Sequence, residues 1–347
     1  MSEITERLIR NRSLTKTEYE LLIKEYSPEN AKLLSEEAVR IRKEIYGSKV
    51  YIRGLIEISN ICKNDCLYCG IRKSNKNCDR YRLTEKEILS CCKTGYDIGF
   101  RTFVLQGGED GYFTTQKLCE LIRAIKRNHP DCAVTLSLGE KSKEEYEALF
   151  RAGADRYLLR HETADSEHYK KLHPPYLTLE NRLKCLYDLK ETGFQTGCGF
   201  MVGSPFQTVK TLAQDLSFIE KFQPDMCGIG PFIPHKDTPF RDFPAGSADF
   251  TCYLLSVIRI ICPNVLLPAT TALGTLSENG REKGILSGAN VIMPNLSPEN
   301  VRNKYMLYNN KLSSGAESAE KLYELKKRIN AIGYTIVCDK GDAERKF

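Results

Sequence analysis

The sequence lacks any long uninterrupted apolar run, which excludes a membrane-spanning helix. Its most apolar stretch, residues 253–267, is broken by Arg259 and Pro263 and is too short to cross a bilayer. The start of the chain also lacks the apolar core of a secretory signal peptide. We therefore expect a cytoplasmic protein without membrane contacts. No low-complexity tract or linker is visible, and tryptophan is absent.

The chain has little excess of either charge. Lys and Arg number 51 against 45 Asp and Glu, a formal net charge of +6, and the charges are scattered along the sequence. This balance does not predict nucleic-acid binding, although an anionic small ligand is compatible with it. With 41% hydrophobic and 28% charged residues in a length of 347, the composition predicts a globular protein with one large domain or two small ones.

Cysteine, by contrast, is abundant, with 14 residues. Thiols stay reduced in a cytosol, so this number indicates metal binding, redox chemistry or simply buried thiols. Their positions are more informative than their number. Cys62, Cys66 and Cys69 lie within eight residues in the spacing Cys-x3-Cys-x2-Cys. We expect the other eleven to pack as small hydrophobic side chains.

Short β-rich runs alternate with amphipathic helical patterns after residue 47, and residues 1–46 predict two helices. The runs are 52–59, 102–106, 133–138, 156–159, 196–202, 226–229, 265–269 and 291–293. The helices are expected at 84–98, 114–128, 142–152, 178–192, 208–222, 249–262, 278–287 and 317–332. This alternation predicts an α/β fold, a (β/α)8 TIM-type barrel with an N-terminal helical extension. A doubly wound open sheet is the alternative. We expect an N-terminal helical cap at 1–46 and a barrel domain at 47–347, which includes a C-terminal helix and tail.

The Cys-x3-Cys-x2-Cys loop follows the first predicted strand, at the end of a barrel where active sites gather. Three thiolates in one loop can bind an iron–sulfur cluster. Three ligands for a four-iron cluster leave one iron open to a substrate or cofactor. The alternative is a structural zinc site that uses Cys78 or another cysteine as its fourth ligand, although no further pair of ligands follows at zinc-site spacing.

Polar residues and glycines also follow other predicted strands. The second strand ends in Gln-Gly-Gly-Glu-Asp at 106–110, where adjacent glycines either form a turn or let a ligand approach the backbone. After the fourth strand, Arg160 and Glu162 share one face and would point into the barrel mouth, in a ligand site or a rim salt bridge. His161 has the opposite parity, and we expect a structural role for it. Arg182 opens the next helix, where a guanidinium could bind a carboxylate or remain solvated.

The cysteine loop resembles that of the radical S-adenosylmethionine (SAM) superfamily, because Tyr68 places an aromatic residue before the third cysteine and the loop follows the first barrel strand. The resemblance implies that Cys62, Cys66 and Cys69 bind one [4Fe–4S] cluster and that SAM chelates its open iron. It further implies that one electron from the cluster cleaves SAM to methionine and a 5′-deoxyadenosyl radical.

Several further segments resemble HydE, the family of radical SAM maturases of [FeFe]-hydrogenase, whose relatives include biotin synthase and methylornithine synthase. The resemblance runs from about residue 47 to residue 310, and the Arg-His-Glu segment at 160–162 and the double threonine at 270–271 distinguish it. It implies that SAM is contacted by Tyr68, Gln106, Gly108, Ser137, Glu162 and Arg182. It implies a substrate cavity lined by Arg160, Thr270, Thr271, Met293 and Tyr308.

The same resemblance implies an organometallic substrate, a cysteine-bound Fe(CO)2CN unit made by a partner maturase, and an electron donor as a further partner. Some members of the family carry a second, C-terminal cluster. Residues 311–322 contain no cysteine, so we do not expect that cluster here. Among enzymes, the runner-up is a radical SAM mutase or sulfur-inserting enzyme of the methylornithine synthase or biotin synthase type. Outside enzymes, the alternative is a metal-binding module with zinc or a closed cluster.

Overall fold

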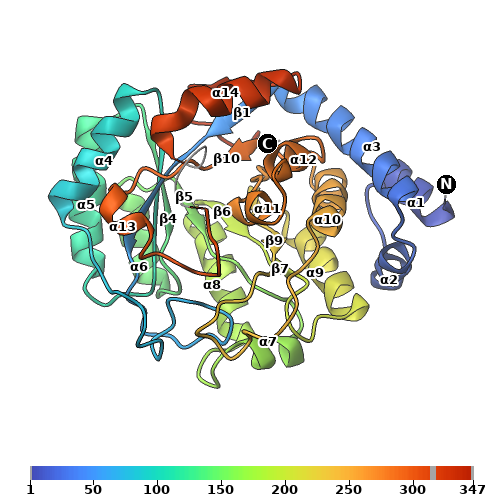
Figure 1. Cartoon of the computed structure of the whole chain (residues 1–347), viewed down its shortest axis with the longest axis horizontal. Coiled ribbons are helices and arrows are strands. Elements are labelled where there is room, and N and C mark those ends of the chain that lie inside the picture. The colour runs from blue at the N-terminus through green and yellow to red at the C-terminus, as the bar shows by residue number, and fades with distance from the viewer. Residues whose placement is uncertain (1, 313–317, 345–347) are drawn as a thin grey trace.

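The chain folds around a barrel of parallel strands (Figure 1). The computed structural model describes residues 2–312 and 318–344. The strands of the barrel are β1 (Lys49–Ile52), β2 (Gly54–Ser59), β3 (Thr102–Gly107), β4 (Ala133–Ser137), β5 (Arg156–Leu158), β6 (Gln195–Cys198), β8 (Met226–Cys227) and β10 (Val291–Ile292).

Strand pairing shows how the ring closes. β2, β3, β4, β5, β6 and β8 are parallel neighbours in that order. Leu266 bridges to Met226 of β8, and Pro268 bridges to Val291 of β10, so this segment takes the seventh position. β10 pairs with β1, which continues through Arg53 into β2. These eight positions form one closed ring within the described residues, which confirms the predicted (β/α)8 barrel over the open sheet.

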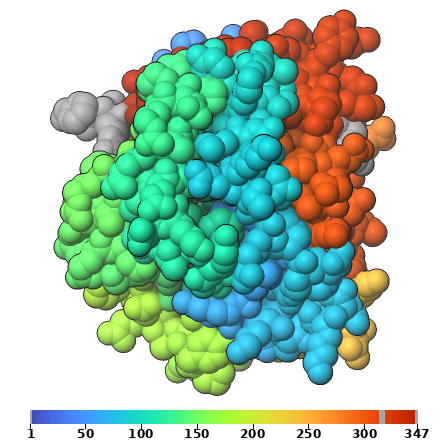
Figure 2. Space-filling view, turned by 90° about the vertical axis from the view of Figure 1, so that its left-hand side faces the viewer, coloured from blue at the N-terminus to red at the C-terminus, as the bar shows by residue number. Residues whose placement is uncertain are grey.

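Helices surround the ring and follow their strands. They are α4 (Glu85–Asp97), α5 (Thr115–Asn128), α6 (Lys143–Arg151), α8 (Leu179–Thr192), α9 (Val209–Phe222), α10 (Ala248–Ile261), α12 (Gly280–Ile285) and α14 (Leu322–Ala331). Figure 2 shows the segment of α4, α5 and α6, coloured cyan to green, as a continuous layer over one side of the barrel. Within residues 2–312 and 318–344, no helix is long and apolar enough to cross a membrane.

Several short helices and one short strand were not predicted from the sequence. They are the helices α7 (Ser166–Leu172), α11 (Thr271–Leu276) and α13 (Glu299–Arg302), the 3₁₀ turn η2 (Ala319–Lys321) and the strand β11 (Thr335–Val337). The last helix was expected to begin at residue 317, which lies outside the described residues, and α14 begins at Leu322. One or two helical turns carry too little periodicity to be recognised in a sequence.

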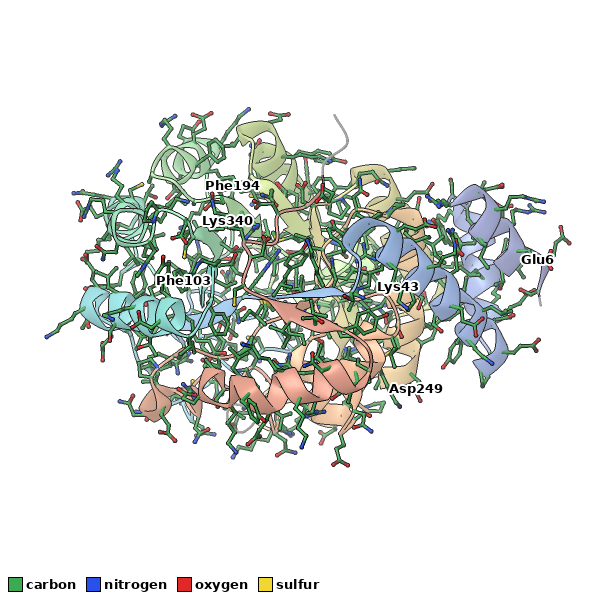
Figure 3. All side chains as sticks on the ribbon, turned by 90° about the horizontal axis from the view of Figure 1, so that it is seen from above. Glu6, Lys43, Phe103, Phe194, Asp249 and Lys340 are labelled. Atoms are coloured by element: carbon green, nitrogen blue, oxygen red, sulfur yellow. The ribbon has the colours of Figure 1, made fainter. Side chains whose placement is uncertain are left out.

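The N-terminal extension contains three helices instead of the predicted two. They are α1 (Glu3–Asn11), α2 (Lys16–Lys24) and α3 (Pro28–Tyr46). Pro28 begins α3, because its fixed φ suits a first helical turn and prevents α2 from continuing. Tyr253 of α10 donates a hydrogen bond to Leu22 O at 2.8 Å, which docks α2 on the barrel. Glu6 marks the far end of this extension in Figure 3. The domain division at residue 46 stays a prediction.

The predicted run at 196–202 is interrupted in the middle. It divides into β6 and β7 (Met201–Val202), and β7 pairs with β9 (Gly230–Pro231) instead of continuing the main sheet. The break lies at Gly199, whose φ is +151°. A Cβ at this position would lie 2.1 Å from Gly228 O, so the close approach of the two backbones requires glycine.

The C-terminal tail closes the barrel end opposite the cysteine loop. β11 pairs with β1, and the following residues reach two buried arginines inside the ring. Arg156 Nη2 donates to Lys340 O at 2.9 Å and binds Asp342 Oδ1 at 2.5 Å. Arg53 Nη2 lies 3.3 Å from Gly341 O, to which it donates. The tail therefore supplies acceptors for two buried guanidinium groups, which reduces the cost of burying them.

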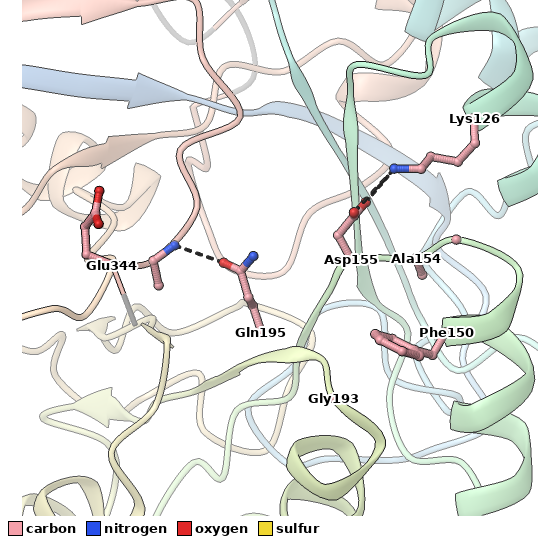
Figure 4. Close-up of a pocket in the computed structure, with 9 residues that line it drawn as sticks. Lys126, Phe150, Ala154, Asp155, Gly193, Gln195 and Glu344 are labelled. Atoms are coloured by element: carbon pink, nitrogen blue, oxygen red, sulfur yellow. Dashed lines mark hydrogen bonds and ion pairs between the residues drawn. The ribbon is translucent and has the colours of Figure 1, made fainter. Parts of the chain in front are cut away.

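A cavity of about 500 Å³ lies beside this tail (Figure 4). Lys126 and Asp155 form an ion pair of 3.1 Å in its wall, and Ala343 N donates to Gln195 Oε1 at 3.0 Å. Phe150 supplies an apolar side. None of the predicted site residues lines this cavity, so it is distinct from the mouth that carries the cysteine loop.

Cysteines outside the loop are mostly buried, as predicted. Nine have buried side chains: Cys91, Cys92, Cys119, Cys132, Cys185, Cys198, Cys227, Cys252 and Cys262. Cys78 is partly exposed and Cys338 is exposed, so the packing prediction is wrong for Cys338.

Candidate functional site

The cysteine loop leaves the end of β2 and is held from the opposite side of the mouth. Gly70 N donates to Leu307 O at 2.9 Å. Asn60 Nδ2 donates to Lys304 O at 2.7 Å and to Asp79 O at 2.8 Å. The loop is therefore fixed between its own C-terminal end and the segment that follows β10.

The three predicted cluster ligands lie close enough to interact electrostatically. Burial raises the pKa of Cys69 to about 12, and it also raises the pKa values of Cys62 and Cys66. Thiols of this kind keep their protons at neutral pH, so iron binding would release protons. Among the residues that the structure describes, no three His, Cys, Asp or Glu side chains are placed to hold a single metal ion.

The ends of β3 and β4 form the neighbouring part of the mouth. Gln106 and Ser137 are register partners at these two strand ends. A Cβ on Gly108 would lie 2.3 Å from Ile61 O and 2.8 Å from Cys62 Cβ. Glycine is therefore required at Gly108, because the backbone of the β3 loop lies directly against the cysteine loop.

Asp110 joins the same two loops through a hydrogen-bond network that the sequence did not reveal. Arg82 binds its carboxylate through Nε at 2.6 Å and Nη2 at 2.9 Å, and Ser59 Oγ donates to it at 2.7 Å. Burial opposes ionisation of Asp110. The hydrogen bonds from Arg82, the Tyr112 backbone and Ser59 outweigh burial and lower its pKa below the ordinary 3.8.

Replacing Asp110 with Asn is expected to reduce the free energy of unfolding by about 1–3 kcal/mol at pH 7. Because the folded-state pKa is lowered, the stabilisation is complete above the unfolded pKa and is lost as the pH falls through the folded pKa. The difference between wild type and D110N should therefore shrink from pH 5 toward pH 3. Urea unfolding of the cofactor-free protein measures it. The exposed Asp242, changed to Asn, is the control, and an equal D110N deficit at every pH would contradict the prediction.

Arg160, Glu162 and Arg182 meet beyond the end of β5. Arg160 Nη2 lies 3.1 Å from Glu162 Oε2. Within the described residues, no hydrogen bond is made by Arg160 Nη2, by Arg160 Nε or by Glu162 Oε2. Arg182 is more constrained, since its Nη1 donates to Arg160 O at 2.7 Å and its Nε to Glu140 Oε1 at 2.5 Å. This group therefore has buried polar atoms with hydrogen-bonding capacity left for a ligand.

Tyr68 is oriented by a histidine that sequence reasoning assigned no role. Burial, and then the nearby Arg182 charge, lower the pKa of His173 to about 3, so its imidazole is neutral at pH 7. Its Nδ1 donates to Tyr169 O at 3.0 Å, which leaves Nε2 to accept from Tyr68 OH at 3.2 Å. The ring of Tyr169 stacks on the same imidazole at 3.9 Å.

The predicted substrate residues are only partly brought together. Tyr308 is close enough to Arg160 for an electrostatic interaction, and burial raises the pKa of Tyr308 to about 12. Thr270 Oγ1 is buried and has no hydrogen-bond partner within the described residues. Thr271 begins α11. Met293 packs against a cluster of buried hydrophobic residues that includes Leu266.

An ion pair inside the mouth was also absent from the sequence analysis. Glu57 of β2 is fully buried, and its Oε1 lies 2.6 Å from Lys311 Nζ. Its Oε2 accepts from Asn295 Nδ2 at 3.0 Å. Lys311 belongs to the segment after β10, so this pair anchors that segment inside the barrel. Residues 311–322, where no second cluster is expected, include 313–317, which lie outside the described part.

The residues at this end of the barrel fit a [4Fe–4S] cluster and SAM. Three thiols form a donor set suited to iron, and Gly108 keeps side-chain atoms away from the loop. Arg160 Nε, which makes no hydrogen bond within the described residues, and the ion-paired Arg160 Nη2 and Glu162 Oε2 could bind the polar groups of an amino acid. The ligand roles of Cys62, Cys66 and Cys69 and of the SAM and substrate residues stay predictions.

Comparison with known proteins agrees with the barrel fold. The sequence profile of the Radical SAM superfamily matches residues 56–219. A crystal structure of methylornithine synthase (PylB) superposes with a TM-score of 0.81 at 23% identity, over 96% of this chain and 97% of the other. Fold and sequence together define a radical SAM enzyme, a family that implies a [4Fe–4S] cluster and SAM.

Two relatives with similar sequences show to which family within the radical SAM superfamily the chain belongs. The [FeFe] hydrogenase maturase subunit HydE of Thermotoga maritima is 44% identical over 310 residues, which cover 89% of this chain and 88% of that protein. The 3-methylornithine synthase of Methanosarcina acetivorans is 27% identical over 83% of this chain and 81% of that protein. The chain belongs to the HydE family of the radical SAM superfamily.

Proposed function

We propose that this chain cleaves SAM reductively and acts in [FeFe]-hydrogenase maturation on a cysteine-bound Fe(CO)2CN precursor. The observation that carries the proposal is the 44% identity to a HydE maturase over nearly the full length of both proteins. Further support comes from the buried Arg160 and Thr270 atoms that have no hydrogen-bond partner within the described residues. A guanidinium and a hydroxyl of this kind suit the carboxylate of an amino-acid-like substrate.

The proposed roles are those that the family resemblance implies for these residues. Cys62, Cys66 and Cys69 would hold the cluster. When bound, the reduced cluster and SAM supply the electron transfer and the radical chemistry. Glu162 and Arg182 would orient SAM, the latter through a guanidinium already fixed by Glu140. The protein's contribution is to hold the two reactants in one orientation and to exclude water.

The other proposed SAM contacts are Tyr68, Gln106, Gly108 and Ser137. The substrate cavity is proposed to include Arg160, Thr270, Thr271, Met293 and Tyr308. The proposed partners are a maturase that supplies the substrate and an electron donor that reduces the cluster. The cytoplasmic location stays a prediction.

Two measurements test the proposed function. After anaerobic reconstitution and reduction with dithionite, the protein is expected to convert SAM to 5′-deoxyadenosine. It is also expected to replace the matching maturase in assembling active [FeFe]-hydrogenase. If a fully loaded protein releases no 5′-deoxyadenosine, or if it contains tightly bound zinc as isolated, the radical SAM activity is refuted and a metal-binding module is supported.

The runner-up remains a mutase or sulfur-inserting enzyme, because a methylornithine synthase is also a relative at 27% identity. Failure of the complementation by a protein that cleaves SAM would favour this alternative. Product analysis with amino-acid substrates would then identify the reaction.

A further inference from the structure

The chain makes an unusual turn directly after β5. Glu162 has a φ of +63°, in the left-handed region that residues with a Cβ avoid, and its side chain is buried. Such a conformation costs about 1–3 kcal/mol and persists only where the surroundings impose it. The turn places Glu162 Oε2 beside Arg160 Nη2. Something outside the turn must therefore hold it.

Asp215 holds the turn on both sides of Glu162. This residue lies on α9 and is fully buried. Its Oδ1 accepts a hydrogen bond from Ala164 N, two residues after Glu162. The same oxygen lies 3.5 Å from His161 Nε2, one residue before Glu162. One carboxylate oxygen thus contacts the residues that flank the strained position.

His161 completes the contact from inside the fold. Its imidazole is fully buried, and Gly199 N donates to its Nδ1 at 3.2 Å. Because Nδ1 is an acceptor, the neutral ring carries its proton on Nε2, which faces Asp215. Gly199 O in turn accepts from Glu162 N at 3.0 Å. The turn is therefore held between β6 and α9, and the phenyl ring of Phe218 packs edge-on against the imidazole at 4.8 Å.

The pair is fully buried, and the Asp215 oxygen that faces His161 Nε2 also accepts the hydrogen bond from Ala164 N. His161 Nε2 and Asp215 Oδ2 have no hydrogen-bond partner within the described residues. A buried polar atom without a partner costs free energy, so the contact between the two side chains is the interaction that retains them. Both side chains are fully buried, so neither is exposed to a ligand at the mouth.

We propose that His161 and Asp215 are positioning residues, which hold Glu162 in its left-handed conformation and Arg160 beside it so that the two can bind SAM and substrate. The inference rests on the proposed function, because it takes Glu162 as a SAM contact and Arg160 as a substrate contact. A structural role alone would predict a loss of stability only. The positioning role predicts a loss of SAM affinity that depends on which imidazole nitrogen is replaced.

Two substitutions of His161 separate these roles. In H161N the shorter amide can still accept from Gly199 N but cannot reach Asp215. In H161Q the longer amide can donate to Asp215 from near the position of Nε2. We expect the Kd for SAM to rise about tenfold in H161N and in D215A, and to stay within about threefold of wild type in H161Q. The iron content should be unchanged in all three.

The measurements are SAM equilibrium binding to the reconstituted protein, iron content, and Tm of the cofactor-free protein. Ile219→Ala on the same helix is the matched control, since it removes buried side-chain volume and leaves the hydrogen bonds to the turn in place. It should lower Tm while leaving the Kd for SAM unchanged. Equal affinity loss in H161Q and H161N, or affinity that follows Tm across all variants, would overturn the inference. If wild type itself binds no SAM, the proposed function has failed instead.

Discussion

Replacing Cys66 with Ala is expected to abolish both cluster assembly and SAM cleavage. Its thiol lies between those of Cys62 and Cys69 in sequence and interacts electrostatically with both. The proposed protein ligand set consists of these three thiolates, so two of them would leave a second iron without its protein ligand. We expect reconstituted C66A to contain well under one cluster per chain and to release no 5′-deoxyadenosine. Iron and sulfide analysis and product chromatography measure the two losses.

Cys78 provides the matched control for that experiment. It lies in the same region of the chain, is partly exposed, and contacts Asn60 Nδ2 at 3.5 Å. In the cluster assignment Cys78 is not a ligand, so C78A should retain four irons per chain and full SAM cleavage. In the zinc alternative it would be the fourth ligand, and C78A would lose metal as C66A does. A C66A protein that keeps four irons would refute the ligand assignment.

The second large effect is expected from Lys311→Met. The substitution removes the ammonium group 2.6 Å from Glu57 Oε1 and leaves a fully buried carboxylate with Asn295 as its remaining side-chain partner. Breaking a buried ion pair from one side typically costs about 3–5 kcal/mol, because the other charge stays buried without compensation. We expect the unfolding free energy of the cofactor-free protein to fall by this amount, measured by urea denaturation.

Two companion variants make this result interpretable. Lys304→Met in the same segment breaks an exposed pair with Asp79, 2.7 Å long, and should cost less than about 1 kcal/mol. The double variant K311M/E57Q removes both buried charges and should recover most of the lost stability. If the double variant were as unstable as K311M, packing of the lysine chain and not its charge would be responsible. Reduced iron loading in K311M alone would link the pair to the cysteine loop through Leu307.

The barrel could be predicted because its evidence is local. Each β-rich run and each helical pattern is visible within a window of about ten residues, and eight such pairs predict the closed ring. The parity of neighbouring residues also sufficed for the turn after β5. It separated Arg160 and Glu162, which face each other, from His161, which is buried on the other side. The Cys-x3-Cys-x2-Cys spacing is equally local, and it indicated at which end of the barrel to expect the site.

Features that depend on distant residues could not be predicted. The Glu57–Lys311 pair joins residues 254 positions apart, and no local pattern identifies one of many lysines as buried. Gly199 interrupts its strand because of the carbonyl of Gly228, which lies between β8 and β9. His173 and Asp110 looked like ordinary loop residues until the fold placed Tyr68 and Arg82 beside them. Tertiary contacts of this kind override local preference.

Strand β1 obtains its two neighbours from the other end of the chain. Tyr51 pairs with Val291 in β10, and Lys49 pairs with Thr335 in β11. A ribosome makes the N-terminal part first. Strand β1 therefore has no strand neighbours until the segments that contain β10 and β11 have been synthesised. Joining segments so far apart in sequence is also entropically slow. The cysteine loop at the end of β2 therefore gains its contacts with Lys304 and Leu307 only after the segment that follows β10 has folded against it.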